Sequence, residues 1–422
     1  MVIGSMVAYV LRLNVSIAGE AMIRDLLLTP VQFGLILSAF AWGYGIFQVP
    51  GGLFGEWLGP RRALTLAITA WGLVTLGTAL LPPAAAGASL IVGVAMVLRF
   101  LMGAAQAPIF PVTAGCSVRA WFPVSGWAMP NAWLAVGATI GGVVAGPFVA
   151  WLVIQVGWRG SFLVVSPLAF VGAALWWWYT RDDPAMHPHV NEAELEFIRA
   201  DPPPSLDAPG VWTAVLVQRD VLPLTASYFC TNYVFYLFFN WFFFYLTDVR
   251  QFSAQVSGWF TGLQWGIGAV AALAGGMICE RLIRRWGVLA GTRATAVGGL
   301  TCCAGLLVAG AAAGNVVLAV LLLCLSFGCV MLVDTAYWVA AMVAGGRHAP
   351  AATGLMNTGG NVVGALGAVA VPLIAGAFGW FAAVASGAVF ALVAAAIWFA
   401  VRLPAPVPER AEELVAVEAG VT

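Results

Sequence analysis

Charged residues are scarce in this chain. They make up 9% of its 422 residues, whereas a water-soluble domain carries roughly a quarter. Lysine is absent, and all 18 basic residues are arginine. They balance 18 acidic residues, so the formal net charge is zero. This balance points to no polyanionic partner. We therefore expect neither nucleic acid nor an acidic protein surface as a partner.

Metal-binding and catalytic patterns are also lacking. The seven cysteines lie almost entirely in apolar stretches, without a CxxC pair or histidine at metal-ligand spacing, which predicts small buried hydrophobes rather than disulfides or metal ligands. The three histidines, His187, His189 and His348, fall in predicted loops, which argues against a histidine proton relay within a membrane. No GxxxxGK[ST] loop is present, and no nucleophile, base and orienting group converge. We expect no metal, no cofactor and no enzymatic activity.

Apolar residues, by contrast, are abundant. They make up 62% of the chain, and the mean hydropathy is +0.95. Long apolar runs exceed the roughly 20 residues needed to cross about 30 Å of hydrocarbon as a helix, and they are continuous rather than alternating, which excludes a membrane β-barrel. The sequence therefore predicts an all-α membrane protein with twelve spans. They lie near residues 2–19, 32–54, 63–81, 90–114, 126–152, 160–180, 222–246, 256–279, 288–310, 315–343, 353–377 and 380–401.

The arginines outside the spans indicate how the chain is oriented. Twelve lie in the loops after even-numbered spans or in the C-terminal tail, and three lie in the odd-numbered loops. Because positively charged loops stay in the cytoplasm, we expect both termini to be cytoplasmic. The chain begins inside its first span without a basic flank, which predicts that an N-terminal extension is missing, and it has no cleavable signal pattern.

Two similar segments indicate an internal duplication. The sequence GGLFGE at 51–56 is followed by GPRR, and GGMICE at 275–280, six spans later, is followed by paired arginines. Between the halves, Asn191-x-x-Glu194 is a capping box that predicts a short surface helix. Six plus six spans are expected of a transporter whose halves rock about a site at the midplane. We predict an N-terminal six-helix bundle (1–180), a cytoplasmic linker (181–220), a C-terminal six-helix bundle (221–401) and a cytoplasmic tail (402–422).

The first of these segments resembles the loop motif of the major facilitator superfamily, with Glu56 at the usual acidic position and Trp57 where arginine is common. The resemblance implies the major facilitator fold, two pseudo-symmetric six-helix bundles. It also implies that the loop is a charged latch at the cytoplasmic helix ends, although ordinary membrane-surface charge is the alternative. The latch residues would be Glu56, Arg61, Arg62 and Arg119 in the first half and Glu280, Arg284 and Arg285 in the second.

Further segments, in matching order, resemble the anion:cation symporter branch of that superfamily. This branch includes sugar-acid, phthalate and tartrate permeases of bacteria and the sialic acid and vesicular glutamate carriers of animals. The segments include RLNVSIA at 12–18, QVPGG at 48–52, RFLMG at 99–103 and MNTGGN at 356–361. The resemblance implies a secondary transporter of organic anions.

Two arginines lie deep inside predicted spans. An arginine at the centre of a span costs about 2.5–3.5 kcal/mol on insertion scales, so it persists where it faces a polar cavity, unless it snorkels to the surface. The resemblance places Arg12 in the cavity as a ligand for the anionic group of the substrate. Arg99 is the second such residue, and Gln106 lies on the same face of its helix. Two guanidinium groups suit carboxylate, sulfonate or phosphate oxygens rather than cations.

Polar residues of three other spans are candidates for the same site. Tyr44 and Gln48 are four residues apart in span two and share a face. Asn357 and Asn361, one turn apart in span eleven, would hydrogen-bond to substrate hydroxyls or, alternatively, hold helices together. Span seven is rich in aromatic residues that would press on an organic substrate or form a membrane-interface belt. Its candidates are Tyr233, Tyr236 and Trp241.

Two positions depart from the branch. In relatives driven by protons, an acidic residue commonly precedes the arginine of span one and another lies in span four, whereas this chain has Leu11 and Gln106 there. Neither residue can carry a proton, which argues against coupling through that pair. Asp334 in span ten is the carboxylate that remains deep in the membrane. It would be a protonatable coupling residue or a counter-charge for Arg12 or Arg99, unless it forms a static salt bridge.

We interpret the chain as a monomeric secondary transporter that imports a small organic anion, such as a sugar acid, carboxylate or sulfonate, across the bacterial inner membrane. Moving an anion inward against the membrane potential costs about 2.3 kcal/mol per charge per 100 mV, so coupling to a proton or sodium ion is expected. Efflux of amphipathic compounds is favoured by the aromatic span seven but opposed by the two arginines. A substrate sensor that has lost coupling is the other alternative.

Overall fold

The structure is a computed structural model that describes residues 2–113, 117, 119–122, 128–199, 221–345 and 349–403. Every regular element in these residues is a helix, as the composition predicts. The first half of the chain forms α1 (Val2–Asp25), α2 (Pro30–Leu58), α3 (Pro60–Ala79), the 3-10 turn η1 (Ala84–Ala86), α4 (Ala88–Gln106), α5 (Ile109–Val112), α6 (Arg119–Trp121) and α7 (Ala128–Tyr179).

A short polar segment follows α7. It contains the 3-10 turn η4 (Pro184–Met186) and the helix α8 (Glu192–Arg199). The amide of Glu194 donates to the side-chain oxygen of Asn191 at 2.8 Å, the N-cap that the sequence pattern predicts for this helix. The remainder of the predicted linker, residues 200–220, lies outside the described residues.

The second half of the chain repeats the helical organisation of the first. It forms α10 (Val221–Phe244), the π-helical turn η5 (Tyr245–Val249), α11 (Ala254–Trp286), α12 (Val288–Ala312), α13 (Val316–Gly345) and α14 (Ala349–Ile397).

The described helices account for twelve membrane spans. Nine helical segments are long and apolar enough to cross a membrane. Two of them, 136–179 and 352–397, are about twice the usual length and are broken by Gly157 and Gly379, so each contains two spans. α10, with 24 residues, is also long enough to cross. The nine segments therefore contain eleven spans, and α10 is the twelfth, which agrees with the predicted number.

The internal duplication is visible in the backbone. Gly59 joins α2 to α3 with φ 79°, and Gly287 joins α11 to α12 with φ 83°. Gly157 and Gly379, with φ of 73° and 83°, are a second equivalent pair. These positive φ values favour glycine, which has no Cβ, so each of these spans follows the previous one through a single residue. The same connection thus recurs at corresponding places in the two halves.

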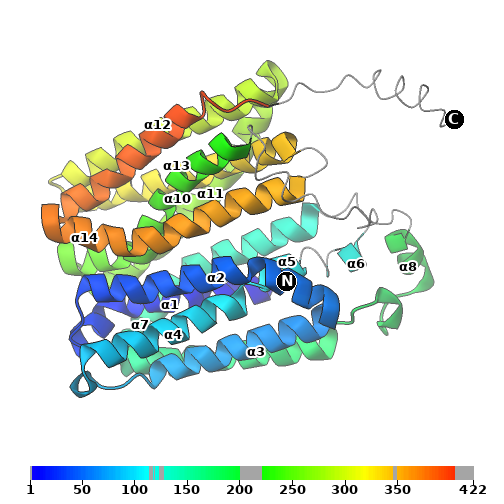
Figure 1. The fold of residues 1–422 in the computed structure, drawn as a ribbon, viewed down its shortest axis with the longest axis horizontal. Coiled ribbons are helices and arrows are strands. Elements are labelled where there is room, and N and C mark those ends of the chain that lie inside the picture. Colours follow the sequence, from blue (N-terminus) through cyan, green and yellow to red (C-terminus); the bar gives the residue numbers. More distant parts are fainter. Residues whose placement is uncertain are drawn as a thin grey trace.

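The two halves form two layers of helices (Figure 1). In the first layer α1 packs on α7, α2 on α4 and α3 on α7, and in the second α10 packs on α14 and α13 on both α11 and α12. The layers meet along three helix pairs, which are α7 with α11, α2 with α14, and α1 with α10. The fold is therefore the predicted pair of pseudo-symmetric six-helix bundles.

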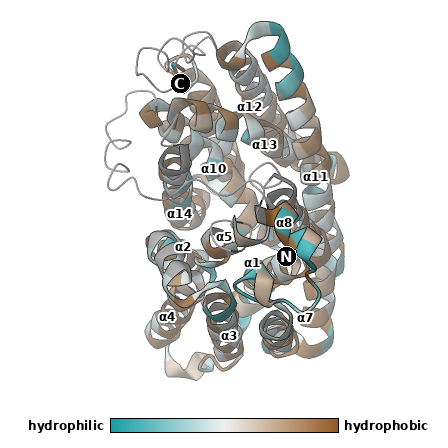
Figure 2. Cartoon of the chain, turned by 90° about the vertical axis from the view of Figure 1, so that its right-hand side faces the viewer, coloured by the Kyte–Doolittle hydropathy of each residue, from teal (hydrophilic) through white to brown (hydrophobic). Residues whose placement is uncertain are grey.

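The molecule has two distinct ends. The N-terminus, α5, α6 and α8 lie at the same end, called the linker end below (Figure 1). Figure 2 looks onto the linker end, with the hydrophilic residues of α8 in front. At the opposite, distal end Arg159 links segments of the first bundle, because its guanidinium pairs with Asp25 at 2.5 Å and donates to the carbonyl of Leu81 at 3.1 Å.

Glycines let helices approach closely inside each bundle. A Cβ added to Gly103 on α4 would lie 2.2 Å from the backbone oxygen of Phe40 and 2.6 Å from the amide nitrogen of Tyr44, both on α2. Any larger residue would therefore push the two helices apart. By contrast, a Cβ on Gly93 of the same helix meets no atom within 4 Å.

We expect Gly103→Ala to destabilise the protein by roughly 1–3 kcal/mol, because the added methyl group overpacks the α2–α4 contact. Gly93→Ala, the matched control, should be neutral or slightly stabilising, since alanine is the better helix former by up to about 1 kcal/mol. Thermal unfolding of the detergent-solubilised protein, followed by tryptophan fluorescence, measures both effects. Equal melting temperatures for the two variants would show that the close approach contributes nothing.

Candidate functional site

Arg12 lies at the centre of the first helix. It is within about 3 Å of the midpoint of α1 along the helix axis and is only 7% exposed. Its Nη2 donates to the hydroxyl of Tyr236 on α10 at 3.3 Å. No carboxylate of the described residues lies within ion-pair distance of this guanidinium. Arg12 therefore does not snorkel to a surface; it is a buried cation with a neutral hydrogen-bond partner.

Aromatic rings surround the Arg12 guanidinium. Four ring centroids lie within cation–π range of its central carbon, which partly offsets the cost of removing the charge from water. They belong to Phe40 at 4.7 Å, Phe239 at 4.9 Å, Tyr44 at 5.1 Å and Tyr9 at 5.8 Å.

Arg99 on α4 occupies a similar environment beside Arg12. It is 5% exposed, and its guanidinium carbon lies 4.8 Å from the centroid of the same Phe40 ring that Arg12 contacts. Its Nε has no hydrogen-bond partner, and it forms no ion pair with any described carboxylate. Two arginines from different helices thus lie within cation–π range of the same Phe40 ring.

A chain of hydrogen bonds leads from Arg12 across both bundles. The Tyr236 hydroxyl donates to Oδ1 of Asn361 at 2.9 Å, and Nδ2 of Asn361 donates to the backbone oxygen of Asn357 at 2.9 Å. Nδ2 of Asn357 then donates to Oε1 of Gln48 at 3.4 Å, one helical turn from Tyr44. The structure therefore brings together polar side chains from α1, α2, α10 and α14 that are separated by up to about 350 positions in sequence.

The unpartnered groups of this region are mostly donors. Nε of Arg12, Nε of Arg99 and Nε2 of Gln106 are all buried without a hydrogen-bond partner. Each such buried donor costs roughly 1–3 kcal/mol, more when it is charged, so the region is suited to a ligand that supplies acceptor oxygens. An organic anion has that chemistry.

Two predicted site residues lie elsewhere in the second bundle. The Tyr233 hydroxyl pairs with Oγ of Ser386 at 2.9 Å, and its ring stacks on Phe390 with a centroid separation of 4.0 Å. Trp241 packs further toward the distal end, with Trp380 at 6.2 Å between centroids. Neither residue has a described contact with Arg12 or Arg99. The Tyr236 side chain, by contrast, faces Arg12.

The structure adds three aromatic residues that the sequence reasoning did not select, namely Phe40, Phe239 and Tyr9. Phe40 precedes Tyr44 by one turn and stacks on it, with ring centroids 5.7 Å apart and an interplanar angle of 17°. The four-residue spacing was a usable signal for Phe40, because residues i and i+4 share a helix face. Nothing in the sequence distinguishes Phe239 from the other phenylalanines of span seven.

Asp334 lies on α13, separate from both arginines. Its Oδ1 accepts from the Tyr228 hydroxyl at 3.2 Å, and its Oδ2 accepts from Nε1 of Trp338 at 2.9 Å. Among the described residues it forms no ion pair, so the static salt bridge considered from the sequence is not formed here.

The predicted latch residues are only partly described. The side chains of Glu56 and Arg119 lie outside the described part of the structure. The amide of Arg61 donates to Oδ1 of Asp182 at 2.7 Å, and its Nε donates to the backbone oxygen of Trp177 at 2.8 Å. Arg61 thus joins α3 to the segment after α7 within one bundle.

The remaining latch candidates lie at the surface. Glu280 pairs with Arg284 at 3.3 Å, one turn along α11, and both side chains are more than 60% exposed. Arg285 lies beside Trp286, and Arg62 is exposed. In this structure these residues therefore make no described contact between the bundles.

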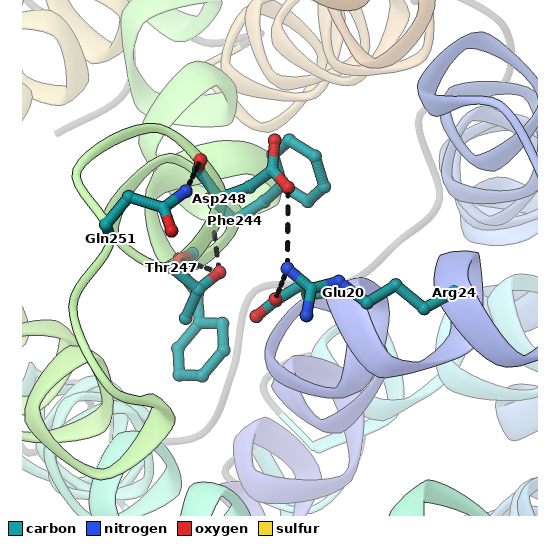
Figure 3. A network of polar contacts seen from close by, with 7 residues as sticks. Glu20, Arg24, Phe244, Thr247, Asp248 and Gln251 are labelled. Atoms are coloured by element: carbon teal, nitrogen blue, oxygen red, sulfur yellow. Dashed lines mark hydrogen bonds and ion pairs between the residues drawn. The ribbon is translucent and has the colours of Figure 1, made fainter.

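A contact between the bundles does occur at the distal end (Figure 3). Nη2 of Arg24, on the last turn of α1, lies 2.7 Å from Oε1 of Glu20 and 3.8 Å from Oδ1 of Asp248 in η5. The backbone oxygen of Asp248 also accepts a hydrogen bond from the side-chain amide of Gln251. This ion pair crosses from one bundle to the other and must break if the distal end opens.

Two six-helix bundles, the first of which carries two buried arginines at mid-helix, are typical of a polytopic membrane transport protein. The sequence model described as Major Facilitator Superfamily matches residues 1–368, and the chain belongs to this family. The family consists of transporters, so the sequence-based prediction of a transporter rather than an enzyme is confirmed.

Similar proteins agree with this assignment. The chain is 30% identical over 362 residues to a probable sulfoacetate transporter of Cupriavidus necator, covering 85% of this chain and 82% of that protein. It is 31% identical over 299 residues to a probable galactarate/D-glucarate transporter of Escherichia coli strain K12, covering 68% and 66% of the two chains. The resemblance to sugar-acid permeases noted in the sequence is thereby confirmed.

A solved structure has the same fold. A bacterial homologue of the human lysosomal transporter Spinster, in an inward-facing and unoccupied conformation, superposes with a TM-score of 0.78 at 16% identity. The match covers 96% of this chain and 98% of that one.

We expect Asp248→Asn to weaken closure of the distal end, because it removes the carboxylate that Arg24 contacts across the bundles. The side chains of Arg24 and Asp248 are 66% and 42% exposed. The free energy of closing the distal end should therefore change by roughly 1 kcal/mol or less, and the change should be largest at low ionic strength. Double electron–electron resonance between spin labels at the exposed distal positions Leu80 and Phe378 would detect the weaker closure as a larger population of long label-to-label distances.

Glu20→Gln is the matched control, because it removes the partner within α1 and leaves the contact between bundles in place. Its distance distribution should stay close to that of the unchanged protein. An Asp248→Asn distribution that coincides with that of Glu20→Gln would contradict the proposed contribution of the Arg24–Asp248 pair.

Proposed function

We propose that this protein imports a small organic anion by alternating access, with Arg12 and Arg99 as ligands of its acidic groups. The observation that carries the proposal is the presence of two buried guanidinium groups at mid-helix with no described carboxylate partner. A cation buried without an acidic neighbour is costly, and an anionic ligand offsets that cost while it is bound.

The position of the two arginines supports binding from both bundles. Arg12 and Arg99 both belong to the first bundle, and Arg12 contacts Tyr236 of the second. An anion held by the two arginines beside Tyr236 would therefore contact both moving halves near the middle of the membrane, where a rocking mechanism requires its site. Asn357, Asn361 and Gln48 would hydrogen-bond to substrate hydroxyl groups.

We infer that the substrate carries two acidic groups. Two guanidiniums that contact one Phe40 ring are suited to two anionic groups of a short molecule, each held by a bidentate contact. Sulfoacetate, galactarate and D-glucarate, which name the substrates of similar transporters, all have an acidic group at each end. A carboxylate, sulfonate or sugar acid of this size fits the inference.

The membrane placement is part of the proposal. We assign the linker end to the cytoplasm of a bacterial inner membrane, because most arginines outside the spans belong to the loops and tail assigned to this side. Both termini are then cytoplasmic, and the distal end with Arg24 and Asp248 faces outward. A monomer is sufficient, since one chain supplies every residue of the site.

Import against the membrane potential requires a coupled cation. Inward movement of a dianion against 100 mV costs about 4.6 kcal/mol, twice the cost for a single charge. A proton or sodium ion moving with the anion lowers that cost. No P-loop sequence is present, so the driving force comes from ion or solute gradients rather than from nucleotide hydrolysis.

We expect Arg12→Lys and Arg99→Lys each to lower uptake of the preferred acid by about 10- to 100-fold. Lysine keeps the charge but loses the planar pair of donors, which is worth roughly 1.5–3 kcal/mol for a hydrogen-bonded anion. Uptake of labelled sulfoacetate, galactarate, glucarate and hexuronate into membrane vesicles measures the effect. Arg402→Lys, at an exposed position outside the spans, is the control and should transport normally.

The same assay separates the alternatives. Binding of an acid without accumulation in any vesicle would favour a sensor, and expulsion of hydrophobic cations would favour efflux. Full activity of both lysine variants would remove the proposed anion site.

We expect Tyr236→Phe to lower uptake by about 5- to 30-fold, because it removes the hydroxyl that links Arg12 to Asn361. Tyr233→Phe, three residues away on the same helix, removes only a contact with Ser386 and should change uptake less than about threefold. Uptake rates normalised to the amount of folded protein make the comparison. Equal losses in the two variants would indicate a general effect on α10.

A further inference from the structure

Asp334 stands apart from the other acidic residues of the described helices. It lies 11 residues from the nearer end of α13, at Gly345, and within about 6 Å of the midpoint of that helix. The other acidic residues of the long helices, such as Glu20 and Glu280, lie within the last two turns. A carboxylate at this depth is costly unless it serves a function or is paired.

The partners of Asp334 are neutral hydrogen-bond donors. Trp338 donates its indole N–H to Oδ2, and Tyr228 donates its hydroxyl to Oδ1. An indole can only donate, whereas a tyrosine hydroxyl can donate or accept. When Asp334 is protonated, Trp338 can therefore keep its bond to one oxygen, while Tyr228 accepts the new O–H from the other. The site accommodates both protonation states without a change of partners.

This arrangement favours a proton over a metal cation. A sodium ion would need several oxygen ligands, and the indole N–H directs a positive hydrogen at one of the two carboxylate oxygens. The groups that face Asp334 are Trp338 from its own helix, Tyr228 from α10 and, at longer range, Tyr9 from α1. The helices α11, α12 and α14, which also pack against α13, present no charged side chain within ion-pair distance in the described residues.

Asp334 and the anion site each contact a tyrosine of α10, Tyr228 and Tyr236 respectively. Tyr228 and Tyr236 are eight residues apart on α10, and both pack against glycines of α14, where an added Cβ would lie 2.9 Å from Tyr228 at Gly360 and 2.5 Å from Tyr236 at Gly364. Tyr9 lies within electrostatic range of both Arg12 and Asp334. Neutralising Asp334 therefore changes the potential at Tyr9, whose ring lies against the Arg12 guanidinium.

We propose that Asp334, with Tyr228 and Trp338, is a proton-binding site that couples anion import to the proton gradient, one proton per transport cycle. This proposal rests on the proposed import of an organic anion. It places the coupling residue in the second bundle and the arginines in the first, so the proton and the acidic groups of the anion are bound by opposite halves of the transporter. A proton bound to Asp334 reduces by one the net negative charge that the loaded transporter carries across the membrane.

The test uses purified protein in proteoliposomes with a pH-sensitive dye trapped inside. For the unchanged protein we expect accumulation of the preferred acid in response to an inward proton gradient and a fall of internal pH when that acid is added outside. Asp334→Asn should lose at least 10-fold in gradient-driven accumulation and should show no substrate-induced proton entry. It should retain exchange of labelled for unlabelled acid within about threefold of the unchanged rate.

Two further variants control the test. Asp334→Glu keeps a carboxyl group and should recover measurable proton entry, whereas a purely structural role for Asp334 predicts no such recovery. Glu194→Gln, on the surface helix α8, removes an acid far from the site and should change neither readout.

The outcomes are distinct. Gradient-driven accumulation by Asp334→Asn at the unchanged rate would overturn the assignment of the proton to this residue. Acid exchange by the unchanged protein without any substrate-induced proton entry would overturn proton coupling while leaving anion transport intact, and a response to a sodium gradient would identify the replacement. Absence of both exchange and accumulation for every acid tested would instead count against the proposed function itself.

Discussion

The arrangement of this protein depends on keeping two arginines inside the membrane. Arg12 and Arg99 are at most 7% exposed, and neither pairs with a described carboxylate, so their charges are stabilised by aromatic rings and by the Tyr236 hydroxyl. These contacts are weaker than an ion pair and leave donor groups unpartnered. A permanent acidic partner would lower the cost of burial but would also compete with a substrate. The incomplete compensation leaves this position suited to an anionic ligand.

The surrounding structure holds these groups while allowing two bundles to move. The polar chain from Arg12 through Tyr236 and Asn361 reaches Gln48, so it crosses the boundary between the bundles twice. Such contacts are individually weak, at roughly 1 kcal/mol each, and can be exchanged when the halves rotate. At the distal end the exposed Arg24–Asp248 pair is similarly modest. The bundles are thus held together near the site by interactions that can break at low cost.

Much of this was predictable from the sequence, because burying a charge in a membrane is expensive and hence informative. Arg12 and Arg99 stand out in their apolar spans, and helical spacing was enough to group Tyr44 with Gln48 and Asn357 with Asn361. The choice within α10 was not predictable. That helix is apolar and buried nearly all round, so it has no amphipathic stripe to indicate which tyrosine faces the arginines. Phe40 was missed although its four-residue spacing from Tyr44 was a usable signal, because an apolar ring does not by itself indicate that it faces a charge.

The glycines that join successive spans bear on how much of the molecule is visible from outside. Gly157 and Gly379 turn the chain through one residue at the distal end, so two of the connections there consist of helix ends with almost no loop. These turns therefore offer little exposed loop for an extracellular protease, antibody or phage to bind. If the distal end faces outward, these two connections expose little loop on the cell surface. Closure of the entrance beside them then has to come from the ends of the helices themselves.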